Sequence, residues 1–67
     1  MKLDNEKILL ILARRMQSKA VLAEKANLSR QTVTKVLKTG KCKPETIGKI
    51  AKALNVDVAD IANLEEN

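Results

Sequence analysis

The chain has no histidine, no aromatic residue and one cysteine among its 67 residues. It therefore lacks the most common general base, any Cys–His nucleophile pair and the ligands of a zinc site. Cys42 has no partner for a disulfide, which fits a reducing compartment. The longest apolar run, residues 8–13, has six residues, far short of the roughly 20 that span a bilayer. We expect a cytoplasmic, non-enzymatic protein with no metal, no cofactor and no membrane segment.

The length and the apolar residues of the chain predict one small helical domain over residues 1–67. A chain of 67 residues is too short to divide into two cores. Its apolar fraction of 45% comes from Leu, Ile, Val, Ala, Met and one Cys, and small aliphatic side chains of this kind favour packed short helices over sheets. The predicted fold class is therefore all-α.

Positive charge is concentrated in the middle of the sequence. Residues 14–43 contain nine Lys or Arg residues and one acid, a balance of +8, whereas the whole chain carries +5 and the flanks therefore carry −3. A segment so strongly basic favours a polyanionic partner such as a nucleic acid.

Apolar periodicity and capping residues predict five helices. The expected segments are residues 3–16, residues 19–26 after the N-cap Ser18, residues 30–39 after Ser29, residues 44–55 beginning at Pro44, and a short last helix. We expect Asn27 and Gly40 to end the second and third helices, because both tolerate the left-handed conformation. The last helix would begin at the N-cap Asp57, with Asp60 completing a capping box and Leu64 extending the core contact.

The first predicted helix has more apolar surface than one core face needs. Its predicted core stripe consists of Ile8, Leu9, Leu12 and Met16. Leu10 and Ile11 lie off that stripe. Either the helix is buried on two sides, or its extra apolar surface contacts a second copy of the chain; the segment from Ile61 to Leu64 is another candidate for that contact.

Residues 18–39 have the layout of a helix-turn-helix, in which the second helix enters the major groove of DNA. The outer face predicted for that second helix carries side chains suited to base edges and no acid. Arg30 can donate two hydrogen bonds to guanine, Gln31 can pair with adenine, and the methyl group of Thr32 or Thr34 can meet a thymine methyl. The pattern indicates readout of double-stranded DNA.

Two blocks of the sequence resemble the lambda-repressor-like (Cro/C1, or XRE-type) family of DNA-binding domains. They are LAEKANLSRQTVTKV at residues 22–36, covering the turn, and PETIGKIAKALNV at residues 44–56. The resemblance implies a compact five-helix domain that binds an operator as a homodimer and regulates transcription in the manner of a repressor of a bacterium, phage or mobile element. The sequence departs from the family pattern at Asn27, where Gly is usual, and in the loop from Thr39 to Lys43.

The resemblance, together with the chemistry of the side chains, assigns two sets of DNA contacts. The residues expected to read bases are Arg30, Gln31, Thr34 and Lys35. The residues expected to bind phosphates are Ser18, Lys19, Ser29, Thr32, Lys38, Lys41 and Lys43. Lys25, Lys49 and Lys52 are expected to be solvated.

Two other functions compete with operator binding. The chain can instead be a protein-interaction module, such as an antitoxin-like or anti-repressor domain, and a protein antagonist is a possible partner in either case. Nonspecific binding of nucleic acid, including RNA, is less favoured because the chain lacks aromatic stacking platforms.

Overall fold

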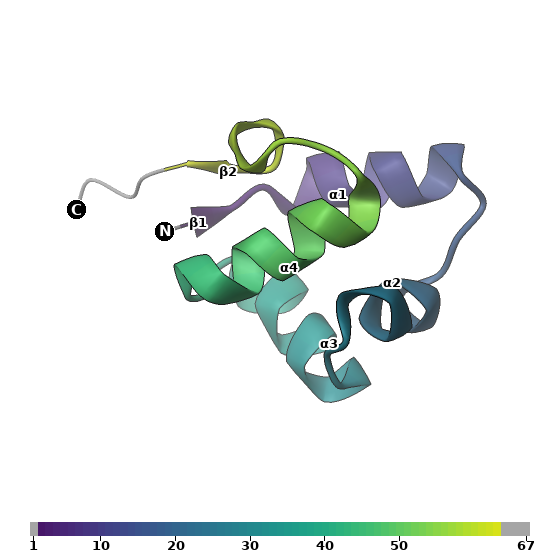
Figure 1. Cartoon of the computed structure of the whole chain (residues 1–67), viewed down its shortest axis with the longest axis horizontal. Helices are drawn as coiled ribbons and strands as arrows, with labels where there is room; N and C mark the ends of the chain where they lie inside the picture. Colours follow the sequence, from purple (N-terminus) through teal and green to yellow (C-terminus); the bar gives the residue numbers. More distant parts are fainter. Residues whose placement is uncertain (1, 64–67) are drawn as a thin grey trace.

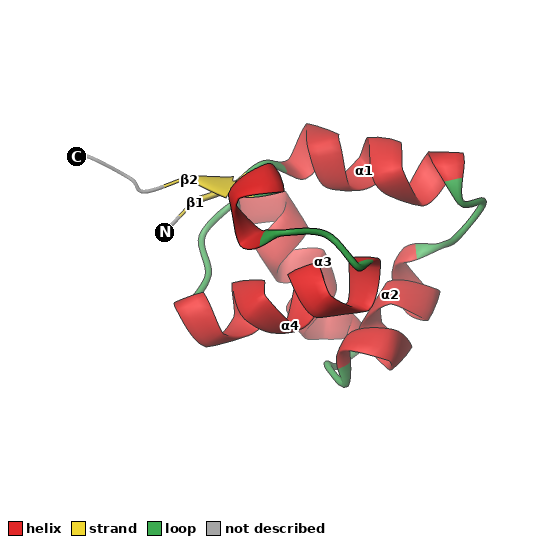
Figure 2. Ribbon diagram, turned by 45° about the horizontal axis from the view of Figure 1, so that its top comes forward, coloured by secondary structure: helices red, strands yellow, loops and turns green. Residues whose placement is uncertain are grey.

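The structure is a computed structural model that describes residues 2–63 of the chain. Within these residues the α-helices are α1 (Asn5–Arg14), α2 (Lys19–Ala26), α3 (Arg30–Thr39) and α4 (Pro44–Leu54). A 3-10 turn, η1 (Val58–Asp60), follows α4, and two short strands, β1 (Lys2–Leu3) and β2 (Ala62–Asn63), pair antiparallel. In Figure 1, α1 and η1 lie above α4, whereas α3 lies below it. Figure 2 shows the two strands at one end of the helical body.

Short-range hydrogen bonds fix the beginnings of the first three helices. Asp4 Oδ1 accepts from the backbone N–H of Lys7 at 3.2 Å. Ser18 and Ser29 cap α2 and α3 in the same way, through their side-chain oxygens. Each of these caps satisfies a backbone donor that has no partner inside its helix. The predicted starts of α2 and α3 at Ser18 and Ser29 are confirmed, and so is the start of α4 at Pro44.

Left-handed residues end α2 and α3 where the sequence predicted them. Asn27 closes α2 with φ 58°, and Gly40 closes α3 with φ 76°. Asn55 closes α4 in the same conformation as Asn27. After α2, the N–H of Leu28 donates to the carbonyl of Ala23 at 2.9 Å, which is the bond that reverses the chain direction in a Schellman motif. Asn27 therefore adopts the left-handed conformation for which Gly is usual at this turn.

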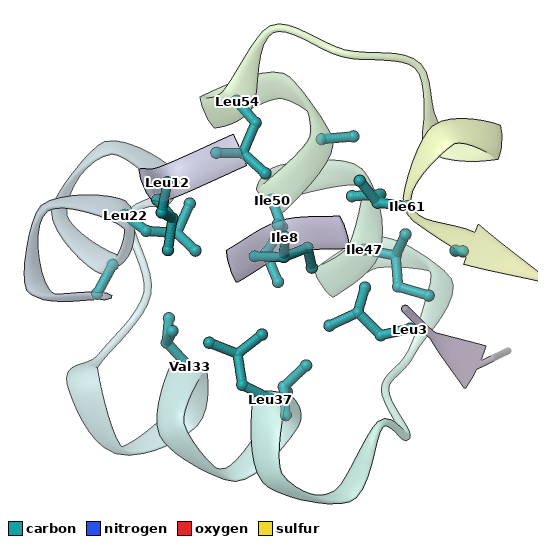
Figure 3. Close-up of a cluster of buried hydrophobic side chains, with 14 residues drawn as sticks. Leu3, Ile8, Leu12, Leu22, Val33, Leu37, Ile47, Ile50, Leu54 and Ile61 are labelled. Atoms are coloured by element: carbon teal, nitrogen blue, oxygen red, sulfur yellow. The ribbon is translucent and has the colours of Figure 1, made fainter. Parts of the chain in front are cut away.

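The core is one cluster of aliphatic side chains to which every helix contributes (Figure 3). α2 packs against both α3 and α4. No polar or charged residue is buried among residues 2–63. The side chains labelled in Figure 3 are Leu3, Ile8, Leu12, Leu22, Val33, Leu37, Ile47, Ile50, Leu54 and Ile61. Because all of them are aliphatic, the fold depends on close packing of branched side chains rather than on aromatic anchors.

The prediction for the first helix was wrong at its end and at two core positions. Ile8 and Leu12 are buried as expected, but Leu9 is 45% exposed and Met16 is 93% exposed. The helix ends early because the N–H of Gln17 donates to the carbonyl of Leu12 at 2.9 Å, which leaves Met16 in the left-handed region with φ 53°. Leu10 is exposed as well, so α1 is not buried on two sides.

The all-α class is confirmed, but the count of five helices is wrong. In place of a fifth helix the chain forms one turn, η1, closed by the predicted capping box of Asp57 and Asp60. Ile61 then leaves the helical region, and its carbonyl accepts from the N–H of Asp4 at 2.7 Å. This bond starts the pairing of β2 with β1, which ends the helical path. Ile61 is buried as predicted, whereas Leu64 lies outside the described residues.

Candidate nucleic-acid interface

The outer face of α3 presents polar and basic side chains to solvent. Val33, Val36 and Leu37 are buried in the core, and their helical spacing turns the opposite side of α3 outward. All of the predicted base-reading side chains are exposed: Arg30, Gln31, Thr34 and Lys35. Lys38 is exposed on the same helix. The structure therefore brings this predicted set together on one helix that carries no acidic residue.

The turn between α2 and α3 sets the position of that face. Leu28 is half-buried and packs against the core cluster directly after the left-handed Asn27. One residue later, Ser29 begins α3. Because Leu28 packs against the core, the turn is fixed and α3 keeps its position relative to α2. This arrangement is the predicted helix-turn-helix.

Ser29 and Thr32 form a hydrogen-bonded pair at the N-terminus of α3. The Ser29 hydroxyl accepts from the backbone N–H of Thr32 at 3.0 Å and donates to Thr32 Oγ1 at 2.8 Å. The hydroxyl proton of Thr32 thus remains available to an external acceptor, and the dipole of α3 favours an anion at this end. Thr32 is half-buried and Ser29 is exposed, which is compatible with the expected phosphate contacts.

The start of α2 offers a second place for a phosphate. Ser18 is exposed, and its Oγ accepts from the backbone N–H of Val21 at 3.2 Å. Lys19 is the exposed first residue of α2. A helix N-terminus with a cation beside it suits a phosphate oxygen.

A hydrogen bond network around Thr39 shapes the basic loop after α3. Thr39 Oγ1 donates to the carbonyl of Lys35 at 2.9 Å and accepts from the backbone N–H of Lys41 at 3.3 Å. Between them, Gly40 is buried, and its carbonyl accepts from the N–H of Leu3 at 2.7 Å. These bonds add to the backbone bond from the Gly40 N–H to the Val36 carbonyl and hold the loop against the end of α3. Lys41 and Lys43 are both exposed.

The structure adds Lys2 to this basic loop, a residue that the sequence analysis missed. Lys2 forms an isolated antiparallel bridge with Lys41 on the edge of β1 that does not pair with β2. Lys2 is exposed. No local pattern could have found it, because only tertiary pairing brings Lys2 beside Lys41. Three lysines, Lys2, Lys41 and Lys43, therefore gather at one end of the fold.

Glu24 is the only acidic residue between Arg14 and Lys43, and it lies next to the predicted interface. Glu24 and Arg30 both line a shallow hollow of about 430 Å³ between α2 and α3. A carboxylate at this position attracts cations and opposes an approaching phosphate. Negative charge in residues 14–43 is thus confined to the edge of the interface beside Arg30.

Cys42 is half-buried in the basic loop and packs against the core cluster. Burial raises the pKa of its thiol above the ordinary value. A raised pKa lowers the fraction of the reactive thiolate at neutral pH. This observation supports a structural role for Cys42.

Residues 2–63 hold neither a metal-binding cluster nor a helix that could span a membrane. No group of three or more Cys, Asp or Glu side chains lies together there in a way that would hold a metal ion. None of the helices that these residues form is long and apolar enough to cross a bilayer.

Comparison with known proteins identifies the family. The model of the Cro/C1-type HTH DNA-binding domain matches residues 7–67. A comparison with curated proteins found no match. The solved structure of native PhpD with cadmium atoms aligns with the whole chain at a TM-score of 0.80 and 22% sequence identity, and the chain spans 15% of that protein's length. This likeness shows the fold alone. The family match covers the helix-turn-helix and the basic loop together, and the chain belongs to the Cro/C1-type helix-turn-helix DNA-binding domains.

Proposed function

We propose that this protein is a sequence-specific regulator of transcription that binds an operator in double-stranded DNA, and that it acts as a repressor. The observation that carries the proposal is the exposed, acid-free outer face of α3, where Arg30, Gln31, Thr34 and Lys35 lie together. A purely electrostatic surface has no need of Gln31 or Thr34. Both add hydrogen-bonding and methyl groups that distinguish one base pair from another.

In the proposed complex α3 lies in the major groove. Arg30 donates two hydrogen bonds to a guanine, Gln31 pairs with an adenine, and Thr34 and Lys35 contact neighbouring bases. Phosphates on either side are bound by two groups of residues. The first group is at the starts of α2 and α3 (Ser18, Lys19, Ser29 and Thr32), and the second lies toward and beyond the end of α3 (Lys38, Lys41, Lys43 and the newly located Lys2).

In this proposal the protein acts by occupying the operator, and it needs neither catalysis nor a cofactor. Two copies of the chain would place their α3 helices in successive major grooves, about 34 Å apart, and so cover a symmetric operator. A homodimer bound across a promoter excludes polymerase from the same DNA. The family match and the charge of the interface support this mechanism.

The test is fluorescence anisotropy of end-labelled DNA from beside the gene, with a scrambled duplex of equal length as the competitor. The label belongs on the DNA because the protein has no Trp or Tyr. We expect a specificity ratio of roughly 10³ or more in about 200 mM salt. Equal binding to both duplexes that vanishes with salt would contradict the proposal.

Two substitutions separate base reading from attraction to the backbone. Arg30→Ala and Gln31→Ala should each cost about 1 to 3 kcal/mol on the specific site and relax the preference at one base pair. Neither change should weaken binding to the scrambled duplex as much as to the specific one. Loss of affinity by the same factor on both duplexes would refute the assignment of base-reading roles.

The second candidate function, a protein-interaction module, is favoured by the apolar surface of α1. Leu9 and Leu10 are exposed there, although neither contributes to the core. In Figure 1, α1 lies above α4 and α3 lies below it. The two functions are therefore compatible in one chain.

A further inference from the structure

A groove runs between α1 and the segment that joins α4 to η1. Its lining consists of Lys7, Leu10, Ile11, Arg14, Arg15, Val56 and Asp60, and it encloses an open volume of about 420 Å³. Ile11 and Val56 are half-buried and pack against the core cluster, so they form the apolar floor. The groove is thus part of the folded body and does not depend on a mobile loop.

The large apolar side chains that residues 2–63 leave exposed are all on α1 or directly after it. They are Leu9, Leu10 and Met16. Leu10 is 57% exposed and stands on the wall of the groove. Leu10 lies on the side of α1 away from the buried Ile8 and Leu12, so packing of the core does not require an apolar residue at this position. A large exposed apolar side chain on the wall of an apolar groove is typical of a surface that a partner covers.

The charges around the groove are mainly positive. Lys7, Arg14 and Arg15 are exposed at its rim, against the single carboxylate of Asp60. Lys7 lies one turn before Leu10 and Ile11 on the same side of α1, and Arg14 lies one turn after them, so cations flank the apolar positions at both ends. In a symmetric contact through this groove, a second copy of the chain would bring the same cations toward these ones. The rim instead fits a partner whose apolar stripe is bordered by Asp or Glu.

We propose that this groove binds an acidic amphipathic helix of another protein. The apolar side chains of that helix, spaced three and four residues apart, would cover Leu10, Ile11 and Val56, and its carboxylates would pair with Lys7, Arg14 and Arg15. Leu10 faces away from the core cluster on α1, and the predicted base-reading side chains face away from the same cluster on α3, so this partner binds while α3 remains on DNA. Together with the proposed binding to an operator, on which this role rests, the groove gives the protein a means of recruiting or receiving a second protein on DNA.

The probe is a pair of fluorescein-labelled synthetic helices of about 15 residues, roughly 22 Å long at 1.5 Å per residue. Both carry leucines at the same three- and four-residue spacing. One has glutamates and the other lysines on the polar face. We expect saturable binding of the glutamate helix to the full chain by anisotropy and no saturable binding of the lysine helix.

Three variants locate the binding. Leu10→Ser and Arg14→Ala should each weaken binding of the glutamate helix about tenfold, and neither removes a buried side chain. Lys38→Ala on α3 is the matched control and should leave the affinity unchanged. Far-UV circular dichroism confirms that each variant is folded, and a saturating unlabelled DNA duplex should not displace the helix.

Three results would overturn the proposal. The first is equal binding of the two helices, or no binding of either. The second is displacement of the glutamate helix by DNA together with loss of binding in Lys38→Ala, which would place the peptide on the DNA-binding face. The third is a dimer in sedimentation analysis that Leu10→Ser abolishes, which would assign the groove to a second copy of the chain.

Discussion

Replacing Lys41 with alanine should make the salt dependence of DNA binding shallower without changing which sequence is preferred. Seven exposed cations lie on α3, at the start of α2 and in the basic loop: Lys2, Lys19, Arg30, Lys35, Lys38, Lys41 and Lys43. Each phosphate contact adds about −0.9 to the slope of log affinity against log salt concentration. The slope for one protomer is therefore no steeper than about −6, which corresponds to a loss of about 10⁴ in affinity between about 50 and 200 mM salt.

Removing one phosphate contact changes that slope by about 0.9. The factor by which Lys41→Ala weakens binding should consequently be about 3.5 times larger at 50 mM salt than at 200 mM. The assay is anisotropy of labelled DNA at four or five salt concentrations, on the specific and the scrambled duplex. The ratio of the two affinities should match that of the unmodified protein, because Lys41 contacts no base in the proposed complex.

Lys52→Ala is the matched control, since Lys52 is an exposed lysine on α4 outside the proposed interface. It removes the same net charge. If attraction depended only on the total charge of the protein, the two variants would have equal slopes. That outcome, or an unchanged slope in Lys41→Ala, would refute the position of the phosphate-binding loop.

Three further predictions concern the turns that hold the interface and the thiol beside it. Gly40→Ala should lower the free energy of unfolding by about 1 to 2 kcal/mol, measured by urea denaturation followed by circular dichroism, because a Cβ is disfavoured at φ 76°. A much larger loss would indicate a steric clash. The structure argues against a clash, because the added Cβ would lie 3.6 Å from the Leu3 carbonyl oxygen. Ser29→Ala should cost about 1 kcal/mol in the same assay through loss of the α3 cap, and unchanged stability would show that the cap contributes nothing. Cys42 should react with iodoacetamide more slowly than a cysteine in an unstructured peptide at pH 8, because its raised pKa leaves less thiolate at that pH. The difference should disappear in denaturant and shrink as the pH rises above the folded pKa, and equal rates in native buffer would contradict the burial of the thiol.

The boundaries of α2 and α3 were predictable because local interactions determine them. Ser18 and Ser29 cap the helices that follow, and Asn27 and Gly40 end them in the left-handed conformation. Each of these caps and helix ends involves only residues that are close together in the sequence. The end of α1 was missed because Met16 is a poor residue for the left-handed region and nothing in its side chain marks a helix end.

The last helix was misjudged for a different reason. The capping box of Asp57 and Asp60 forms as predicted, yet it encloses one turn and no more. What stops the helix is the pairing of Ala62 with Leu3 across the domain. A contact between the two ends of the chain competes with helix continuation and leaves no mark in the local periodicity, so sequence reasoning favoured the wrong outcome.

The same long-range pairing completes the candidate interface. Helical spacing alone predicted the outward face of α3, since the burial of Val33, Val36 and Leu37 leaves the opposite side exposed. The basic loop is instead held by β1, through the bond from Leu3 N–H to the Gly40 carbonyl and the bridge between Lys2 and Lys41. The base-reading helix and the phosphate-binding loop therefore depend on different parts of the fold. A change that loosens β1 should weaken binding to all DNA sequences alike, whereas a change on α3 alters the choice among them.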